Sequence, residues 1–350
     1  MVSVPDVLVE QVPESRATRT GSLLGNHRLP VLEYVLKRVV AGIATLIVAS
    51  VLIFLSIQVL PGNVVEVVLG RNATPARIAA VNAQLHLNQG LFHRYLTFIG
   101  SFLRGDFGQS TAGLVQGSRV QVGHVIGPAI KNSAILAVIV IVLFVPASLA
   151  LGYLSGRKPG SATDHVLSTT TLAVGALPEF LIATVLIYFF FTRLNWLPPI
   201  SSVSSGRSPI DNPKALVLPV ATLLLVSLAF GARLLRASIV EVRSQEYVAI
   251  ARLNGYSEGR IMWRYVLPNA LVPSVQILAQ QLQYLLGGIV VVESVFNYPG
   301  IGEQLVRAIA VRDVQEIMVI ATILSVAYIA INILADVACV LLEPRVRTSL

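Results

Sequence analysis

The sequence predicts an all-α fold, in the form of a polytopic membrane protein. Its 350 residues are 55% hydrophobic and only 13% charged, whereas soluble domains carry about 25% charged residues. The apolar residues gather in six stretches, each close to the roughly 20 residues that a helix needs to cross a bilayer. These stretches are too long for strands, and their Leu, Ile, Val and Ala content suits helices. We therefore expect six transmembrane helices.

The six stretches define the organisation of the chain. The first ends at a Pro-Gly-Asn sequence, and the third is interrupted by Pro178 and Glu179. We expect spans at 39–60, 134–154, 166–191, 216–235, 271–292 and 317–342. The resulting segments are a polar arm at 1–30, a first membrane helix at 31–60, a long outer loop at 61–131, a five-helix core at 132–342 that contains a polar loop at 236–270, and a tail at 343–350.

The basic residues predict the orientation of the chain in the membrane. Six spans place both termini on one side. That side holds ten of the basic residues between and after the spans, namely Arg157, Lys158, Arg233, Arg236, Arg243, Arg252, Arg260, Arg264, Arg345 and Arg347. The other side holds five, Arg193, Arg207, Lys214, Arg307 and Arg312. The arm and the long loop are left out, because long loops translocate largely regardless of charge. Since Lys and Arg accumulate in cytoplasmic loops, we expect both termini and the polar loop in the cytoplasm.

The regions outside the spans have different characters. The arm is polar and has no apolar core, so it is not a cleavable signal peptide. A disordered extension is favoured over a docking segment. The outer loop, by contrast, has apolar residues at helical spacing, which predicts amphipathic helices at the outer surface. These residues are Ile78, Val81 and Leu85, then Leu91, Tyr95, Ile99 and Phe102.

Composition and motifs exclude several classes of protein. The net charge is +8, but the Lys and Arg residues lie at the edges of apolar runs and form no basic stripe, so we expect no nucleic-acid partner. The five His residues lack ligand spacing, so no metal site is expected. Cys339 is the single cysteine, which excludes an intrachain disulfide. The chain also lacks a G-x-x-x-x-G-K-[ST] phosphate loop.

The polar segment 246–270 separates two apolar runs. Its first part is compatible with a helix that stops at Asn254 and Gly255, because glycine takes the left-handed conformation at little cost. Ser257 is placed to cap a second helix, with Glu258 in its first turn. This helix meets Pro268 at the entry to the fifth span. The prediction is a helical elbow that projects into the cytoplasm.

A partner could approach this elbow closely. Ala249 and Ala251 are small, and Gly255 has no side chain. An ordinary charged loop is the alternative, since helix–Gly–helix loops are common.

The elbow resembles the "EAA" loop of permease subunits of bacterial ATP-binding-cassette importers. That loop has three small or acidic residues, a glycine after three more, and an apolar residue followed by a closing Leu-Pro. The corresponding positions hold Ala249, Ile250 and Ala251, then Gly255, then Tyr265, and finally Leu267 and Pro268. The acidic residue is absent from its usual place, and the loop is instead similar to that of the dipeptide/oligopeptide/nickel branch, here "YVAIARLNG" at 247–255.

Further motifs extend the resemblance over about residues 33–347. "LRGDFGQS" at 103–110 and "VVESVFNYPGIG" at 291–302 are similar to signatures of this branch, as are "LPGN" at 60–63 and "EPRVR" at 343–347. The resemblance implies a type I importer permease fold and a multi-pass protein of the bacterial cytoplasmic (inner) membrane.

The resemblance also implies partners and a division of labour. The expected partners are a homologous second permease, two cytoplasmic ATP-binding subunits, an extracytoplasmic substrate-binding protein and the lipid bilayer. ATP and Mg would be bound by the ATPase subunits, so this chain would hold no cofactor and would not be an enzyme. The transported substrate would most often be a di- or oligopeptide. The coupling to the ATPase would involve Glu246, Tyr247, Ala249, Ala251, Arg252, Gly255, Leu267 and Pro268.

Other polar residues are candidates for the transport path. A carboxylate inside a membrane span is costly unless it faces a cavity or a partner, so Glu179 is one candidate, with snorkelling to the interface as the alternative. Gln281 lies in the fifth span, where amides either line a wet route or bond helix to helix. At the outer end of that span, Glu293, with Phe296, Pro299 and Gly300, would form an external gate, or Glu293 would simply be solvated.

Two other classes of function compete with an importer permease. An ion-coupled secondary transporter would need intramembrane carboxylates or broken helices in matching halves. Glu179 and Asp336 are the only deep carboxylates, and no inverted repeat is visible. A membrane serine protease would need a G-x-S-x-G motif, which the sequence lacks.

Overall fold

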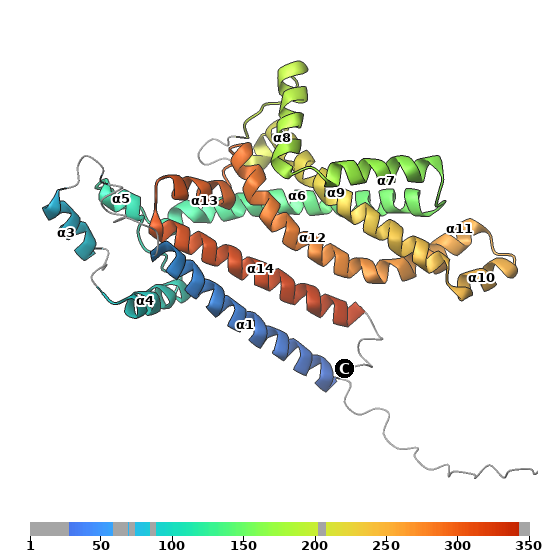
Figure 1. Cartoon of the computed structure of the whole chain (residues 1–350), viewed down its shortest axis with the longest axis horizontal. Coiled ribbons are helices and arrows are strands. Elements are labelled where there is room, and N and C mark those ends of the chain that lie inside the picture. Colours follow the sequence, from blue (N-terminus) through green and yellow to red (C-terminus); the bar gives the residue numbers. More distant parts are fainter. Residues whose placement is uncertain (1–27, 59–68, 70–73, 85–88, 202–207, 343–350) are drawn as a thin grey trace, which may run out of the picture.

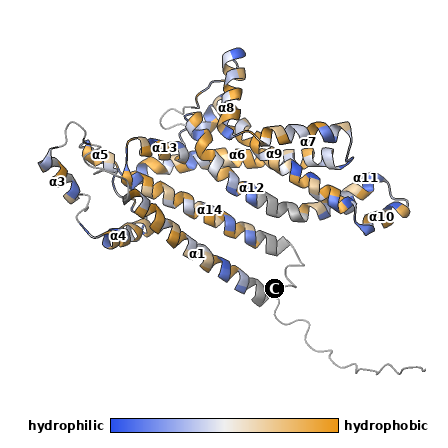
Figure 2. Cartoon of the chain, viewed as in Figure 1, coloured by the Kyte–Doolittle hydropathy of each residue, from blue (hydrophilic) through white to orange (hydrophobic). Residues whose placement is uncertain are grey.

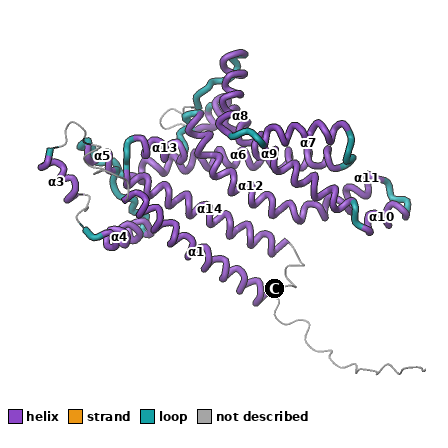
Figure 3. Tube along the Cα trace, viewed as in Figure 1, coloured by secondary structure: helices purple, strands orange, loops and turns teal. Residues whose placement is uncertain are grey.

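The structure, a computed structural model, consists mainly of helices joined by loops and turns in the part of the chain that it describes (Figure 3). This part comprises residues 28–58, 69, 74–84, 89–201 and 208–342, without the side chains of 28–32, 58, 77, 80–81, 84, 272–279 and 338–342. It contains no strand, only an isolated bridge between Gln109 and Gln121. The all-α prediction is confirmed. The predictions for the arm before residue 28, for the tail and for the motifs at 60–63 and 343–347 lie outside the described residues.

Five long helices make up most of the molecule (Figure 1). They are α1 (Arg28–Gln58), α6 (Val122–Gly156), α9 (Pro213–Arg243), α12 (Leu267–Val295) and α14 (Val314–Leu342). Shorter helices connect or flank them: α3 (Pro75–Gln84), α4 (Leu91–Leu103), α5 (Thr111–Val115), α7 (Ala162–Gly175), α8 (Glu179–Ile187), α10 (Glu246–Leu253), α11 (Glu258–Ile261) and α13 (Ile301–Ala310). A π-helical segment, Tyr188–Arg193, extends α8.

Helix α6 begins well before the predicted second span. Its first turns, predicted as outer loop, carry the buried residues Val122, Ile126 and Ala129, and the buried Ser133 follows them. Their spacing of three and four places them on one helix face. The helix therefore starts earlier than the predicted span, because this stretch is amphipathic and packs by one face, while a span is recognised by uniform apolarity. The predicted boundary between the outer loop and the core stays a prediction.

The number of membrane spans is not confirmed. Among the described residues, four helices are long and apolar enough to cross a membrane, or five if the bent pair α7 and α8 counts as one span. The four are α1, α6, α9 and α14. The fifth predicted span falls in α12, part of which has no described side chains.

The third predicted span is two helices rather than one. Helices α7 and α8 meet at an angle of 103°. Pro178 precedes α8 and adopts an extended conformation. Proline has no backbone N–H, and it disfavours helical geometry in the residue before it, here Leu177. The predicted interruption thus becomes a sharp bend, and α8 points away from the bundle (Figure 1).

Close contact between α6 and α9 forms the centre of the fold. A Cβ atom on Gly152 would lie 2.7 Å from the Leu235 side chain, and one on Gly156 would lie 2.8 Å from Ile239. From the other side, a Cβ on Gly231 would lie 2.6 Å from Phe144. Small residues allow helices in membranes to approach this closely. Helix α12 packs on α9, and α14 packs on both α12 and α1.

The two ends of the bundle differ. Helices α10 and α11 lie at the same end as the start of α1 and the end of α14, while α4, α5 and α13 lie at the other end (Figure 1). Figure 2 shows apolar residues along α1, α6 and α14 and more hydrophilic ones at α10 and α11. The expectation that the elbow and both termini share one side of the membrane concerns terminal residues that lie outside the described part of the chain. Which side faces the cytoplasm stays a prediction.

The long outer loop contains helices, as its spacing predicts. In α4, the Tyr95 ring lies 5.6 Å from that of Phe54 on α1, and its hydroxyl is 2.8 Å from Ser50 Oγ. Phe98 is buried in the same cluster. The apolar face of α4 therefore packs against α1. Leu85 lies outside the described residues.

Candidate functional site

The elbow has the predicted helix–turn–helix form. Helix α10 ends at Leu253, and Gly255 follows with a φ of +77°. Its N–H donates to the Arg252 carbonyl at 3.0 Å, and the next N–H, of Tyr256, donates to the Ala251 carbonyl at 3.2 Å. The left-handed glycine that closes the helix is thus confirmed.

The second half of the elbow differs from the prediction in one detail. Ser257 occupies the position before α11, but its side chain accepts no capping hydrogen bond. An ion pair closes the turn instead, with Arg252 Nε 2.7 Å from Glu258 Oε1. A π-helical segment, Met262–Val266, then leads into α12, and Pro268 lies in the first turn of α12.

Buried apolar side chains fix the elbow to the bundle. They form one cluster of Leu235, Ile239, Val248, Ala251, Ile261, Met262, Val266 and Ala270, with Leu267 partly buried against it. The prediction that Ala251 is open to a partner is therefore wrong, because Ala251 is only 4% exposed and belongs to this buried cluster. Ala249, on another side of α10, is exposed.

Three large side chains on α10 face away from this cluster. Tyr247, Ile250 and Leu253 are 41%, 56% and 87% exposed. They are three residues apart, so they lie along one side of the helix. We call them the elbow patch. The sequence prediction included Tyr247 and missed the other two, although large apolar residues at this spacing in a polar segment are a signal for an interface.

Charged residues connect the elbow to the ends of α6 and α9. Arg243 Nη2 lies 3.4 Å from Glu258 Oε2, and Nη1 of the same arginine donates to the carbonyl of Arg157. The hydrogen bond from Arg252, together with the charges of Arg252 and Arg243, holds the pKa of the Glu258 carboxyl below its usual range. Glu246 is exposed in the first turn of α10.

A third ion pair joins α7 to α9. Arg236 contacts Asp164 twice, with Nε to Oδ1 at 2.5 Å and Nη2 to Oδ2 at 2.7 Å. Asp164 also accepts hydrogen bonds from the Gly160 N–H and the Ser168 hydroxyl. Its side chain is only 3% exposed. No local sequence pattern predicts this pair, whose partners are 72 residues apart.

The two predicted path residues lie in different surroundings. Glu179 is the first residue of α8, and Tyr284 of α12 donates a hydrogen bond of 2.5 Å to its Oε1. Gln281 is 8% exposed and lines an apolar cavity of about 160 Å³ between α6, α9 and α12. Its amide nitrogen has no hydrogen-bond partner among the described residues. Glu179 does not line that cavity.

The four predicted gate residues belong to a buried outer junction of α6, α12 and α13. Glu293 is fully buried, accepts from the Ser133 hydroxyl at 2.5 Å and accepts from the Gly302 N–H at 2.7 Å. A solvated Glu293 is therefore excluded. Phe296 is also fully buried.

Backbone contacts complete this outer junction. The Pro299 carbonyl accepts from the Asn132 amide at 2.8 Å. A Cβ on Gly300 would lie 2.1 Å from the Glu293 carboxylate. Whether the junction acts as a gate stays a prediction.

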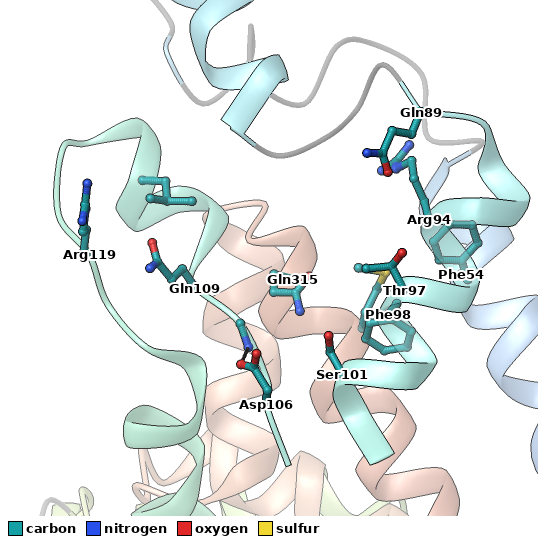
Figure 4. A pocket seen from close by; sticks show the side chains of 13 residues that line it. Phe54, Gln89, Arg94, Thr97, Phe98, Ser101, Asp106, Gln109, Arg119 and Gln315 are labelled. Atoms are coloured by element: carbon teal, nitrogen blue, oxygen red, sulfur yellow. Dashed lines mark hydrogen bonds between the residues drawn. The ribbon is translucent and has the colours of Figure 1, made fainter. Parts of the chain in front are cut away.

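A larger cavity lies at the same end of the molecule, between α4, α14 and the segment after α4 (Figure 4). Its volume is about 640 Å³. Figure 4 shows Asp106, Gln109 and Gln315 on one part of the wall and Arg94 and Thr97 on another. Polar side chains thus supply much of its lining.

The described geometry defines a class of protein: a helical membrane protein with a compact elbow at one end of its bundle. Two family models match the chain. The binding-protein-dependent transport system inner membrane component model matches residues 148–348, and the corresponding N-terminal model matches residues 31–116. The chain belongs to this family of inner-membrane transport components, and it is a multi-pass membrane protein.

Curated relatives agree with this assignment. The probable peptide ABC transporter permease protein y4tP of Sinorhizobium fredii is 33% identical over 316 residues, which cover 90% of this chain and 99% of that protein. The glutathione transport system permease protein GsiC of Escherichia coli (strain K12) has the same identity and coverage. A solved structure described as "Crystal structure of an amino acid ABC transporter with histidines" has a TM-score of 0.47 at 17% identity and covers 62% of this chain and 92% of that one. The family and the curated relatives favour an ABC importer permease over an ion-coupled transporter.

Proposed function

We propose that this chain forms, with a homologous second permease, the membrane path of an ATP-driven peptide importer. Two cytoplasmic subunits would bind ATP and Mg and hydrolyse the ATP, and an extracytoplasmic protein would deliver substrate. The family assignment and the names of relatives such as y4tP and GsiC support this proposal. Di- and oligopeptides are the proposed substrates.

The elbow patch is the observation that carries the coupling part of the proposal. Leu253 is 87% exposed and Ile250 is 56% exposed, and apolar side chains exposed together on a polar segment mark an interaction surface. The buried side of α10 belongs to the same cluster as residues of α9, α11 and α12. An ATPase subunit that binds the patch would therefore act directly on the membrane helices.

A charge on the elbow patch tests this coupling. Leu253→Glu removes no buried contact, so the protein should reach the membrane at the wild-type level. The introduced carboxylate should be desolvated at the interface, which costs several kcal/mol. ATPase subunits should then no longer co-purify with the permease, and uptake should be lost.

Leu103→Glu is the matched control, because Leu103 is 78% exposed at the opposite end of the bundle. It should leave ATPase co-purification unchanged. Normal co-purification and uptake by Leu253→Glu would mean that the elbow is an ordinary loop.

The proposed orientation has its own test. After Cys339 is replaced, a cysteine at Gln109 should react with a membrane-impermeant thiol reagent in intact cells. A cysteine at Glu258 should react only after the membrane is opened. Labelling of the Glu258 position in intact cells would contradict both the orientation and the coupling role of the elbow.

A further inference from the structure

Three side chains from three helices meet beside the bend between α7 and α8. Glu179 begins α8, and its Oε1 accepts the hydroxyl of Tyr284 on α12 at 2.5 Å. The Tyr284 ring in turn lies 5.7 Å from the ring of Phe230 on α9, with an angle of 51° between the planes. The three residues are far apart in the sequence, so the fold alone brings them together.

Glu179 is available to a ligand. Among the described residues it makes no ion pair, and Oε1 is its one oxygen with a hydrogen bond. A carboxylate within a membrane segment usually has a functional partner. A positive charge from outside the described part of the chain would be able to pair with it.

The space around the carboxylate is open. Tyr284 and Phe230 are 43% and 37% exposed, and Glu179 is half-buried. A Cβ on Gly288 would lie 3.6 Å from Glu179 Oε1 and 3.5 Å from Leu223 Cδ2. The missing side chain of this α12 glycine leaves space beside the carboxylate.

The position suits a site on a transport path. Tyr284 and Phe230 lie near the middle of α12 and α9, both helices long enough to cross a bilayer by their rise of 1.5 Å per residue. The bend at Pro178 frees backbone groups, which at membrane depth are tolerated where protein or a water-filled cavity can satisfy them. A carboxylate beside such a bend has water or protein around it.

We propose that Glu179, Tyr284 and Phe230 form a binding site for the protonated amino terminus of the transported peptide. The carboxylate supplies the opposite charge, and the two aromatic faces attract an ammonium group by cation–π interaction. The Tyr284 hydroxyl holds the carboxylate in place. This inference rests on the proposed function as a peptide permease, since the amino terminus is the one cation that most peptides share.

The test compares peptides with and without that charge. The complete importer in proteoliposomes is given trialanine or N-acetyl-trialanine, and ATP-dependent uptake of each is measured. In the Glu179→Gln variant, the ratio of trialanine to N-acetyl-trialanine uptake should fall about tenfold, the size expected for a hydrogen bond between charged groups. Phe230→Leu should lower the same ratio a few-fold.

Controls separate this role from a structural one. Glu33→Gln makes the same chemical change at an exposed residue of α1 and should leave the ratio at the wild-type value. Equal loss of both peptides in Glu179→Gln, or no loss of either, would overturn the ammonium site and leave peptide transport standing. Absence of uptake of both peptides by the wild-type importer would overturn peptide transport, and the site with it.

Discussion

The elbow and the outer junction are built alike but have opposite surroundings. Each connects short helices to one end of α12, and each contains a glycine near a glutamate. At the elbow, a Cβ on Gly255 would meet nothing within 4 Å, and the exposed Glu258 pairs with Arg252 and Arg243. At the outer junction, a Cβ on Gly302 would lie 2.4 Å from the Val290 Cα, and Glu293 is fully buried.

Glycine therefore serves a different purpose in each region. The outer junction has its hydrogen-bond partners within the chain, so its glycines serve packing. The elbow leaves large apolar side chains exposed, so its glycine serves a turn that presents a surface. The sequence pattern alone does not distinguish the two, because glycine satisfies both requirements.

Gly302→Ala should have the largest effect on stability. The added carbon would overlap the backbone at Val290, which cannot move without shifting α12. Overpacking of this kind costs about 3 kcal/mol, and we expect a strongly lowered thermal midpoint of the detergent-solubilised protein, with little protein in the membrane. Gly259→Ala is the control, since nothing lies within 4 Å of the added carbon. Equal thermal midpoints for the two variants would contradict the view that the outer junction is tightly packed and the elbow is open.

Gly255→Val should have an intermediate effect on stability and a large effect on transport. A β-branched residue at a φ of +77° is strained by about 1–2 kcal/mol. The protein should still reach the membrane, but the displaced elbow should bind ATPase subunits weakly, and uptake should be abolished. Gly259→Val places the same side chain at a helical position and should retain both ATPase binding and uptake. Wild-type uptake by Gly255→Val, at normal expression, would contradict the role of the turn.

Glu258→Gln should have the smallest effect on stability. The Glu258 side chain is 60% exposed, and exposed ion pairs contribute less than about 1 kcal/mol. Because the pKa of Glu258 is lowered in the folded protein, its contribution is present above the ordinary value of 4.5 and is lost as the pH falls through the folded value.

The thermal midpoint of the wild type should therefore fall slightly more than that of Glu258→Gln on acidification below about pH 4.5, the unperturbed value for a glutamate. High salt should reduce this difference. A large difference between the thermal midpoints of the two proteins at neutral pH would contradict this expectation. It would mean that the ion pair of Glu258 is essential to the structure of the elbow.

The sequence predicted features that depend on local composition. Runs of neighbouring residues predicted the all-α class, the approximate positions of the long apolar helices in the sequence, and the left-handed conformation of Gly255. The predictions that were wrong depended on three-dimensional contacts. Ala251 is small but buried, and the Ser257 cap is replaced by an ion pair with a partner from α10.

Contacts between distant residues could not be predicted. Glu179 and Tyr284 are 105 residues apart, and Ser133 and Glu293 are 160 apart. One sequence contains no information on which residue of one span faces which residue of another. The candidate residues Glu179 and Glu293 were found because a carboxylate in an apolar run is rare, but their partners required the fold.

The glycine contacts between α6 and α9 have a mechanical consequence. Leu235 and Ile239 touch Gly152 and Gly156 of α6, and the same two side chains belong to the cluster beneath the elbow. A displacement of the elbow patch is therefore transmitted to α6 through Leu235 and Ile239, which pack directly against the two glycines. We expect the elbow, α9 and the part of α6 around Gly152 and Gly156 to move as one rigid unit. The movement that opens a route for substrate would then occur in the helices around this unit.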